Sequence, residues 1–338
     1  MKATKIAAVI CVLALAASLF GCRKTDRDPS SNSLLESSGT LMDSIEDMLS
    51  SDSEPMDDII SGDESSETSL HESGLSSEPD GFSFSDASDV EDNLSSDVSA
   101  TMGTDFEQIG ALDGTSNGWG PGVNRGDDGR PLAPVMFQEK YGKYAVDFIR
   151  PEKGVIYLTF DEGYENGYTP AILDTLKEKQ VTAVFFVTLS YAKYNPELIQ
   201  RMIDEGHIVG NHSSTHPDMT SLSLQDAYDD IMQLHEHIKE NFGYEMKLFR
   251  FPMGVYSEQT LALLQSMGYR SVFWSFAYKD WETDNQPDPT NAYERITGFA
   301  HDGAIYLLHA VSSTNTSILA DVIDSFREQG YTLAAYPQ

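Results

Sequence analysis

Cysteine is almost absent from this chain of 338 residues. Both cysteines, Cys11 and Cys22, lie within the first 22 residues. The rest of the chain therefore has neither the thiol pairs that form disulfides nor the thiolates that hold many structural zinc ions. A hydrophobic core of ordinary size has to carry its stability.

Basic residues are missing from a long stretch, since no lysine or arginine occurs between Arg27 and Arg125. Residues 23–104 contain 21 acidic and 3 basic residues, a net charge of −18 in a chain whose total is −32. Strong charge of one sign with few aromatic residues predicts a disordered, extended segment. The negative sign disfavours nucleic acid as a partner, and no obligate protein partner is indicated.

Only one long apolar run is present, at residues 6–20, and it is short for a membrane-spanning helix. Lys2 and Lys5 precede it, which is typical of a secretory signal. The run ends in Leu-Phe-Gly-Cys, which resembles a bacterial lipobox. That resemblance implies a lipoprotein anchored through acyl chains on Cys22 to the outer face of the cytoplasmic membrane. A plain signal peptide, with Cys22 incidental, is the alternative.

We therefore predict three parts: a lipoprotein signal peptide at 1–21, a disordered Ser/Asp/Glu-rich tether at 22–115 and one folded domain at 116–338. About eighty flexible residues span roughly 50 Å, which suits a tether between membrane and cell wall. The stretch 105–150 is rich in glycine and asparagine signals for loops. Trp119 is expected to pack this stretch against the domain.

Strand and helix signals alternate through the rest of the domain. The predicted strands are 155–160, 182–187, 207–210, 247–249, 271–274, 304–308 and 332–334, and the predicted helices are 168–179, 196–205, 224–242, 257–267, 292–300 and 316–329. This alternation predicts parallel βαβ units and an α/β fold of barrel size. An open doubly wound sheet is the competing architecture, but no glycine-rich phosphate loop follows the first strand.

The predicted strand 155–160 is followed at once by Asp161, Glu162 and Gly163. In a parallel barrel, polar residues at the carboxyl end of a strand point into the site. A helix-capping role for Asp161 is the structural alternative. Thr169 lies closer to the predicted helix start and suits that role better.

Two histidines, His212 and His216, follow the third predicted strand four residues apart. Imidazoles at this spacing can converge on one ion, although the spacing alone also arises by chance on exposed turns. The pair lies at a strand end, as Asp161 and Glu162 do. Two histidines and a carboxylate suit a divalent metal ion that activates water.

Three further strand ends carry polar or aromatic residues, at Arg250, at Asp280–Trp281 and at His309. A guanidinium near a carboxylate orients it and keeps it ionised. An acid facing the metal would protonate the leaving nitrogen in amide hydrolysis. Alone, the first is as readily a surface turn, and a single histidine at a strand end is more often structural.

Taken together, five stretches resemble the polysaccharide deacetylase family, also called carbohydrate esterase family 4 or the NodB homology domain. They are T-F-D-E-G at 159–163, H-S-S-T-H at 212–216, R-F-P-M-G at 250–254, D-W at 280–281 and L-L-H at 307–309. The flanking strings, such as G-Y-E-N-G-Y and V-F-W-S-F-A-Y-K-D-W, are similar to the branch of δ-lactam-biosynthetic de-N-acetylases. The resemblance implies a distorted or incomplete (β/α) barrel of about seven strands.

The resemblance also implies a role for each matching residue. Asp161 would be the general base held by Arg250; Glu162, His212 and His216 the metal ligands; His309 the general acid oriented by Asp280; Trp281 and Leu307 the walls of the acetyl pocket; and Met253 the donor of a backbone amide to the oxyanion. The metal would be divalent, with zinc the first candidate. Glu162 stands where the family usually has an aspartate, and its side chain is one methylene longer.

The implied activity is metal-dependent removal of acetyl from an amino sugar of peptidoglycan glycan strands. The branch points to N-acetylmuramic acid on the route to muramic δ-lactam, and so to spore-cortex peptidoglycan. One alternative is a deacetylase for N-acetylglucosamine polymers. The other is a catalytically weak, wall-binding lipoprotein, which the unusual Glu162 keeps open.

Overall fold

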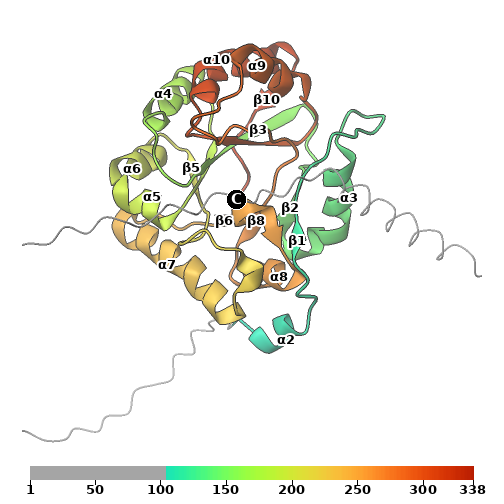
Figure 1. Cartoon of the computed structure of the whole chain (residues 1–338), viewed down its shortest axis with the longest axis vertical. Helices are drawn as coiled ribbons and strands as arrows, with labels where there is room; N and C mark the ends of the chain where they lie inside the picture. The colour runs from blue at the N-terminus through green and yellow to red at the C-terminus, as the bar shows by residue number, and fades with distance from the viewer. Residues whose placement is uncertain (1–103) are drawn as a thin grey trace, which may run out of the picture. The chain divides into compact units, whose positions relative to one another are not determined.

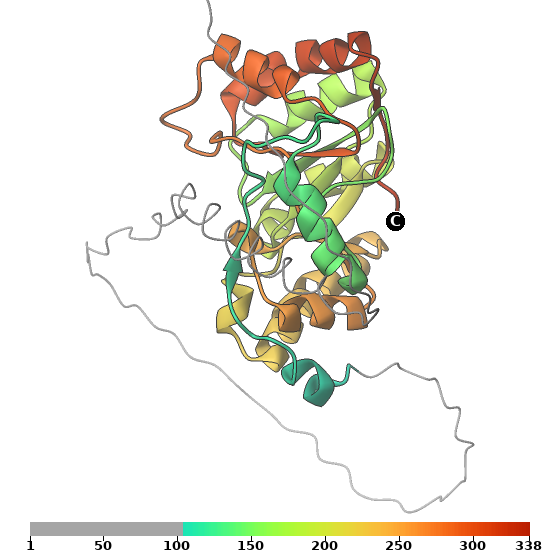
Figure 2. The ribbon, with the colours of Figure 1, turned by 90° about the vertical axis from the view of Figure 1, so that its right-hand side faces the viewer.

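A computed structural model describes residues 104–338 (Figures 1 and 2). The predicted signal peptide, the lipidation site Cys22 and the tether as far as residue 103 lie outside the described residues. Within 104–338, no helix combines the length and apolar character needed to cross a membrane.

The described part alternates strands and helices. The helices are α2 (Phe106–Gly110), α3 (Leu132–Tyr141), α4 (Thr169–Lys179), α5 (Leu189–Tyr194), α6 (Pro196–Asp204), α7 (Leu224–Phe242), α8 (Glu258–Ser266), α9 (Pro289–Gly298) and α10 (Ser313–Glu328), with short 3-10 helices η1 (Gly142–Tyr144), η2 (Met219–Ser221) and η3 (Pro252–Gly254). The strands are β1 (Asn117–Gly118), β2 (Val146–Asp147), β3 (Val155–Glu162), β4 (Val184–Val187), β5 (Ile208–Asn211), β6 (Leu248–Phe249), β7 (Val255–Tyr256), β8 (Arg270–Val272), β9 (Ala304–His309) and β10 (Thr332–Leu333).

The main sheet is parallel throughout and curls into a barrel. Its strands follow the order β9-β3-β4-β5-β6-β8-β2, and the short β10 pairs with the start of β3. The ring is completed by irregular backbone, because the segment after β8 forms a parallel bridge between Phe276 and Tyr306 of β9. Figure 1 shows the helices arranged around the strands. The predicted α/β barrel, distorted and with about seven strands, is confirmed.

Side chains that alternate along the strands fill the barrel. The interior cluster takes at least one residue from each of six strands and one from the chain end: Tyr157, Val184, Phe186, Ile208, Leu248, Val272, Ile305 and Tyr336. Because successive side chains of a strand point to opposite faces, residues an even number of positions further along also point inward. This rule decides which residues meet at the carboxyl ends of the strands.

The ordered segment that precedes the barrel is longer than the sequence predicted. Helix α2 precedes the predicted domain start at residue 116, and it packs against α7 and α8. Helix α3 and strand β2 lie in the stretch predicted as loops. The folded part therefore includes residues assigned to the tether.

Trp119 fixes this early segment to the barrel, as predicted. Its side chain is 7% exposed, and its ring lies 4.5 Å from the Phe148 ring, centroid to centroid. The indole N–H donates to the carbonyl of Trp274, and the backbone N–H donates to that of Gly254. Strand β1 pairs antiparallel with β7 beside these contacts. The segment therefore supports the turn that contains Met253.

Candidate active site

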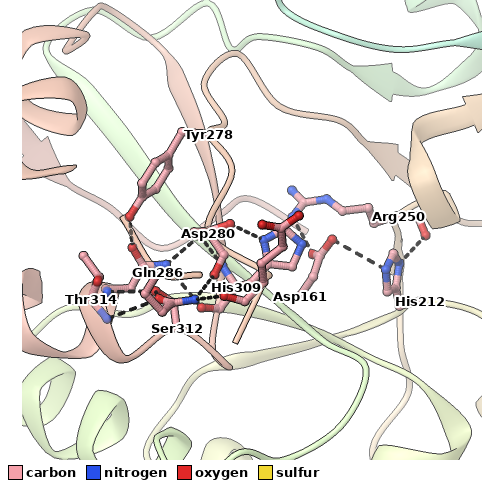
Figure 3. Close-up of polar contacts among 11 residues, drawn as sticks. Asp161, His212, Arg250, Tyr278, Asp280, Gln286, His309, Ser312 and Thr314 are labelled. Carbon is pink, nitrogen blue, oxygen red and sulfur yellow. Dashed lines mark hydrogen bonds and ion pairs between the residues drawn. The ribbon is translucent and has the colours of Figure 1, made fainter. Parts of the chain in front are cut away.

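Four of the predicted site residues point into the mouth of the barrel for one geometric reason. Each lies an even number of positions after an interior residue: Asp161 follows Tyr157, His212 follows Ile208, Arg250 follows Leu248, and His309 follows Ile305. The strands are parallel, so their carboxyl ends meet at the same end of the barrel. Figure 3 shows Asp161, His212 and Arg250 together, with His309 and Asp280 beside them.

Asp161 and Arg250 form a buried ion pair. The Arg250 Nη1 atom lies 2.8 Å from Asp161 Oδ1, and the arginine is fully buried. The guanidinium also donates to the carbonyls of Val272 and Phe273, which fix its orientation. Burial opposes ionisation of Asp161, but the charge and hydrogen bond of Arg250, together with the nearby His212 and His309, lower the pKa of the carboxyl. Asp161 is thus an ionised carboxylate whose second oxygen faces His212.

His212 is a neutral imidazole with one nitrogen directed at Asp161. Burial lowers its pKa to about 4. Its Nδ1 atom lies 2.9 Å from the carbonyl oxygen of Arg250, which can only accept, so Nδ1 carries the proton. The Nε2 lone pair then points toward Asp161 Oδ2 at 3.5 Å. The ring of His216, on the exposed side of the same loop, lies edge-on to His212 with centroids 4.9 Å apart.

Glu162 points away from this group. Strand β3 continues through Glu162, so the side chain faces the helices on the side opposite to Asp161. It is completely buried, and its carboxyl oxygens accept from the hydroxyl of Thr169, at the start of α4, at 3.3 and 3.4 Å. Burial raises the pKa of Glu162 well above its ordinary value, and the nearby Glu165 adds to the effect. It is therefore a neutral acid outside the barrel.

His309 and Asp280 form the second charged pair. His309 Nδ1 donates to Asp280 Oδ1 at 2.7 Å, and the His309 backbone N–H donates to Asp280 Oδ2 at 2.9 Å. Burial disfavours the charged imidazole, but the charge and hydrogen bond of Asp280, together with the charge of Asp161, raise the pKa of His309. No residue of 104–338 is a hydrogen-bond partner of the ring's Nε2 atom. Trp281 packs against His309 with ring centroids 5.5 Å apart.

A polar network that no sequence pattern indicated lies behind Asp280. Asn315 Nδ2 donates to Asp280 Oδ2 at 2.6 Å, and Tyr278 donates its hydroxyl proton to Asn315. Gln286 donates to the Asp280 backbone carbonyl and accepts from Ser312, the N-cap of α10 (Figure 3). These residues hold Asp280 from behind. Single polar residues in loops and at helix starts give no signal of such a role.

Met253 and Leu307 lie on two different elements, a turn and a strand. Met253 has a φ of 56° in the turn η3, three residues after Arg250, and it is 36% exposed, so it lies at the surface. Its neighbour Gly254 also has positive φ, and a Cβ there would come within 2.8 Å of Trp274. Leu307 is buried and points inward, between Ile305 and His309 on β9.

The donor set fits a metal ion only in part. Two adjacent imidazoles, of which His212 is neutral with a free lone pair, suit a divalent ion. Glu162 cannot join them without leaving its contact with Thr169 and crossing to the other face of β3. Among residues 104–338, no group of three or more His, Cys, Asp and Glu side chains is placed to hold an ion. The predicted three-ligand set is therefore not assembled.

Comparisons with known proteins identify the family. Residues 149–272 match the family model described as polysaccharide deacetylase. A protein of Geobacillus stearothermophilus is 46% identical over 204 residues, which cover 60% of this chain and 77% of the relative. The peptidoglycan-N-acetylmuramic acid deacetylase PdaA of Bacillus subtilis is 44% identical over 207 residues, covering 61% of this chain and 77% of that protein. This chain belongs to the polysaccharide deacetylase family.

The solved structure of Bacillus subtilis PdaA, described as a family 4 carbohydrate esterase, superposes with a TM-score of 0.62 at 41% identity. The match covers 66% of this chain and 95% of that one. The family model stops at residue 272, so His309 and Asp280 lie beyond it. The structural match spans nearly the whole of the relative, and its extent agrees with a single deacetylase-type barrel.

Proposed function

We propose that this protein is a peptidoglycan N-deacetylase. The observation that carries the proposal is the pairing of Asp161 with His309. The two are direct partners in the register of the adjacent parallel strands β3 and β9, and both point inward. Arg250 lowers the pKa of one and Asp280 raises the pKa of the other. Two titratable groups pushed in opposite directions are the arrangement expected of a base and an acid.

The metal is assigned to His212 and His216, with zinc as the first candidate. Bound there, a divalent ion would supply Lewis acidity, which would polarise the acetyl carbonyl and make water more acidic. The carbonyl of Arg250 sets the tautomer of His212, a second contact that typically orients metal-binding imidazoles. Glu162 takes no part.

The chain's own groups carry the protons. Asp161 takes a proton from the attacking water as the oxygen adds to the acetyl carbon. His309, held by Asp280, gives a proton from Nε2 to the amide nitrogen as the C–N bond breaks. The products are acetate and the free amine of the sugar. Arg250 stays paired with Asp161 and keeps that carboxyl ionised at the start of each cycle.

Three residues shape the acetyl pocket. The Met253 backbone amide is assigned to the oxyanion. The turn that carries it packs closely on Trp274, where Gly254 leaves no room for a Cβ. Trp281 and Leu307 are assigned as the apolar walls. Trp281 also contacts the His309 ring, with centroids 5.5 Å apart.

The substrate assigned is N-acetylmuramic acid, on the basis of the 44% identity to a relative with that specificity. Muramic acid differs from N-acetylglucosamine by a lactyl group, which is anionic once its peptide is removed. Lys279, the residue before Asp280, is an exposed cation whose Nζ atom lies 2.6 Å from Glu282 Oε1. The lactyl carboxylate would compete with Glu282 for that lysine.

Product analysis on two substrates tests the assignment. We expect acetate release from peptide-stripped peptidoglycan strands, little release from chitin oligomers, and closure of the freed muramic amine to a δ-lactam. Mass spectrometry of digested strands distinguishes the two sugars. Acetyl loss only from glucosamine residues would move the enzyme to the alternative substrate class. No acetate from either substrate, with zinc present, would favour the wall-binding lipoprotein instead.

The location is assigned to the outer face of the bacterial cytoplasmic membrane, through a lipid on Cys22. The substrate lies outside that membrane, and the tether proposed for residues 22–103 would let the domain reach it. Cys22→Ala is expected to release the protein into the soluble fraction. Continued membrane association of that variant would contradict the lipid anchor.

A further inference from the structure

The loop that carries the two histidines has an unusual backbone. Ser213 and His216 both have positive φ, at 67° and 55°. Residues other than glycine adopt this conformation at a cost, and they keep it only where surrounding contacts determine it. The loop between β5 and η2 must therefore be held by its neighbours.

Asp230, on the second turn of α7, supplies most of those contacts. Its Oδ1 accepts from the backbone N–H of Ser214 at 2.8 Å. Its Oδ2 accepts from the hydroxyl of Thr215 at 2.8 Å and from the Thr215 backbone N–H at 3.2 Å. The Ser214 hydroxyl donates to the Asp230 backbone carbonyl at 2.6 Å. One carboxylate thus binds both residues at the centre of the loop.

A second tie leads to the next residue of the same helix. Asn211, the last residue of β5, donates from Nδ2 to the carbonyl of Ile231 at 2.9 Å. Its Oδ1 accepts from the backbone N–H of Ser213 at 2.8 Å. Inside the loop, Ser213 accepts from the His216 N–H at 2.8 Å. The start and the centre of the loop are therefore fixed to adjacent residues of α7.

We propose that Asp230 is a positioning residue for the metal site, which sets the separation of the His212 and His216 imidazoles. The inference rests on the proposed function in one respect, namely that these two histidines hold the ion. With only two protein ligands in place, their separation is the part of the site that the protein controls. The carboxylate acts through the loop and does not itself touch the substrate.

Asp230→Asn in the full chain tests the proposal. An amide keeps one acceptor oxygen but turns an N–H₂ group toward a backbone N–H, so at least one bond to the loop is lost. Zinc titration by calorimetry is expected to give an affinity about 10–100-fold weaker than that of the unchanged protein, the usual effect of losing a contact behind a metal ligand. Excess zinc should then restore most of the turnover number. Equal zinc affinity would overturn the proposal.

Asp229→Asn is the matched control. Asp229 is the preceding residue of the same helix, is exposed, and accepts from Gln225 at 2.9 Å. The substitution removes the same charge from the same helix without touching the loop. Zinc affinity should be unchanged. An equal loss in both variants would mean that charge, and not the hydrogen bonds from Asp230 to the loop, sets the zinc affinity. That result would also overturn the proposal.

Two further measurements test the hydrogen bonds from Asp230 to the loop independently of the proposed function. In metal-free protein, Asp230→Asn should speed hydrogen exchange at the Ser214 and Thr215 amides. Unchanged exchange would show that Asp230 does not hold the loop, whether or not zinc binds, and would overturn the proposal. If the unchanged protein binds no zinc, the metal assignment fails and the exchange result alone decides. Should Asp230→Asn not fold, Thr215→Val removes one of the bonds, and a few-fold loss of zinc affinity is expected.

Discussion

The two faces of strand β3 shift the pKa values of adjacent carboxyl groups in opposite directions. On the inner face, Asp161 pairs with Arg250 at 2.8 Å, and its pKa is lowered. On the outer face, burial raises the pKa of Glu162 well above the ordinary value, and its hydrogen-bond partner among residues 104–338 is the Thr169 hydroxyl. Neither side chain is in open water, so burial alone does not decide the charge. A buried acid ionises where a fixed cation meets it and stays neutral where none does.

The largest expected difference between the two faces is in turnover. Asp161→Asn removes the proposed base and should lower kcat by about 10²–10⁴ while zinc affinity is kept. Glu162→Gln replaces a neutral acid by a neutral amide of the same shape, so kcat and zinc affinity should change little. Acetate release and zinc titration on both variants check this. A large loss of zinc affinity in Glu162→Gln would return Glu162 to the metal site.

A second expected difference concerns the pH at which the inner face works. Protonated His309 is the proposed acid, so kcat/KM should fall as pH rises through its raised pKa. Asp280→Asn removes the charge that raises this pKa, so the basic limb should move to lower pH. The pH profile of kcat/KM measures the shift. Glu162→Gln is the control and should leave the basic limb in place. If Asp280→Asn does not move the basic limb, His309 is not the general acid.

The smallest expected effect lies on the outer face and is one of stability. The pKa of Glu162 is raised in the folded protein. Its contribution to the stability of the fold is therefore complete below the ordinary pKa of 4.5 and is lost as pH rises through the folded pKa. Over that range the unfolded chain binds fewer protons, and stability falls with pH. Glu162→Gln lacks this titration. Its Tm relative to the unchanged protein should therefore increase from pH 4 to pH 8; a constant difference would mean that Glu162 is ionised when folded.

The sequence predicted the inner face well because two signals coincide there. Polar residues that follow β-branched runs identify strand ends, and the parallel fold brings those ends together. Asp161, His212 and His309 were found in this way, and the family resemblance supplied their expected roles. Arg250 needed the same reasoning, since its run taken alone resembles a surface turn.

The outer face was misread for a physical reason. The predicted strand ended at Phe160, which would leave Asp161 and Glu162 together in a loop, whereas β3 continues through Glu162. Strand ends are uncertain by one or two residues, and in a strand one residue decides which face a side chain takes. The contacts of Asp230 and Asn315 were missed because nothing in their local sequence marks a partner far along the chain.

The central claim is that the register partners Asp161 and His309 are held in opposite charge states at the same pH. Nuclear magnetic resonance titration of the His309 imidazole in the full chain tests it most directly. We expect a pKa above the ordinary 6.5 for His309, lowered in Asp280→Asn and unaffected by Glu162→Gln. A His309 that titrates at or below 6.5 in the unchanged protein would contradict the account.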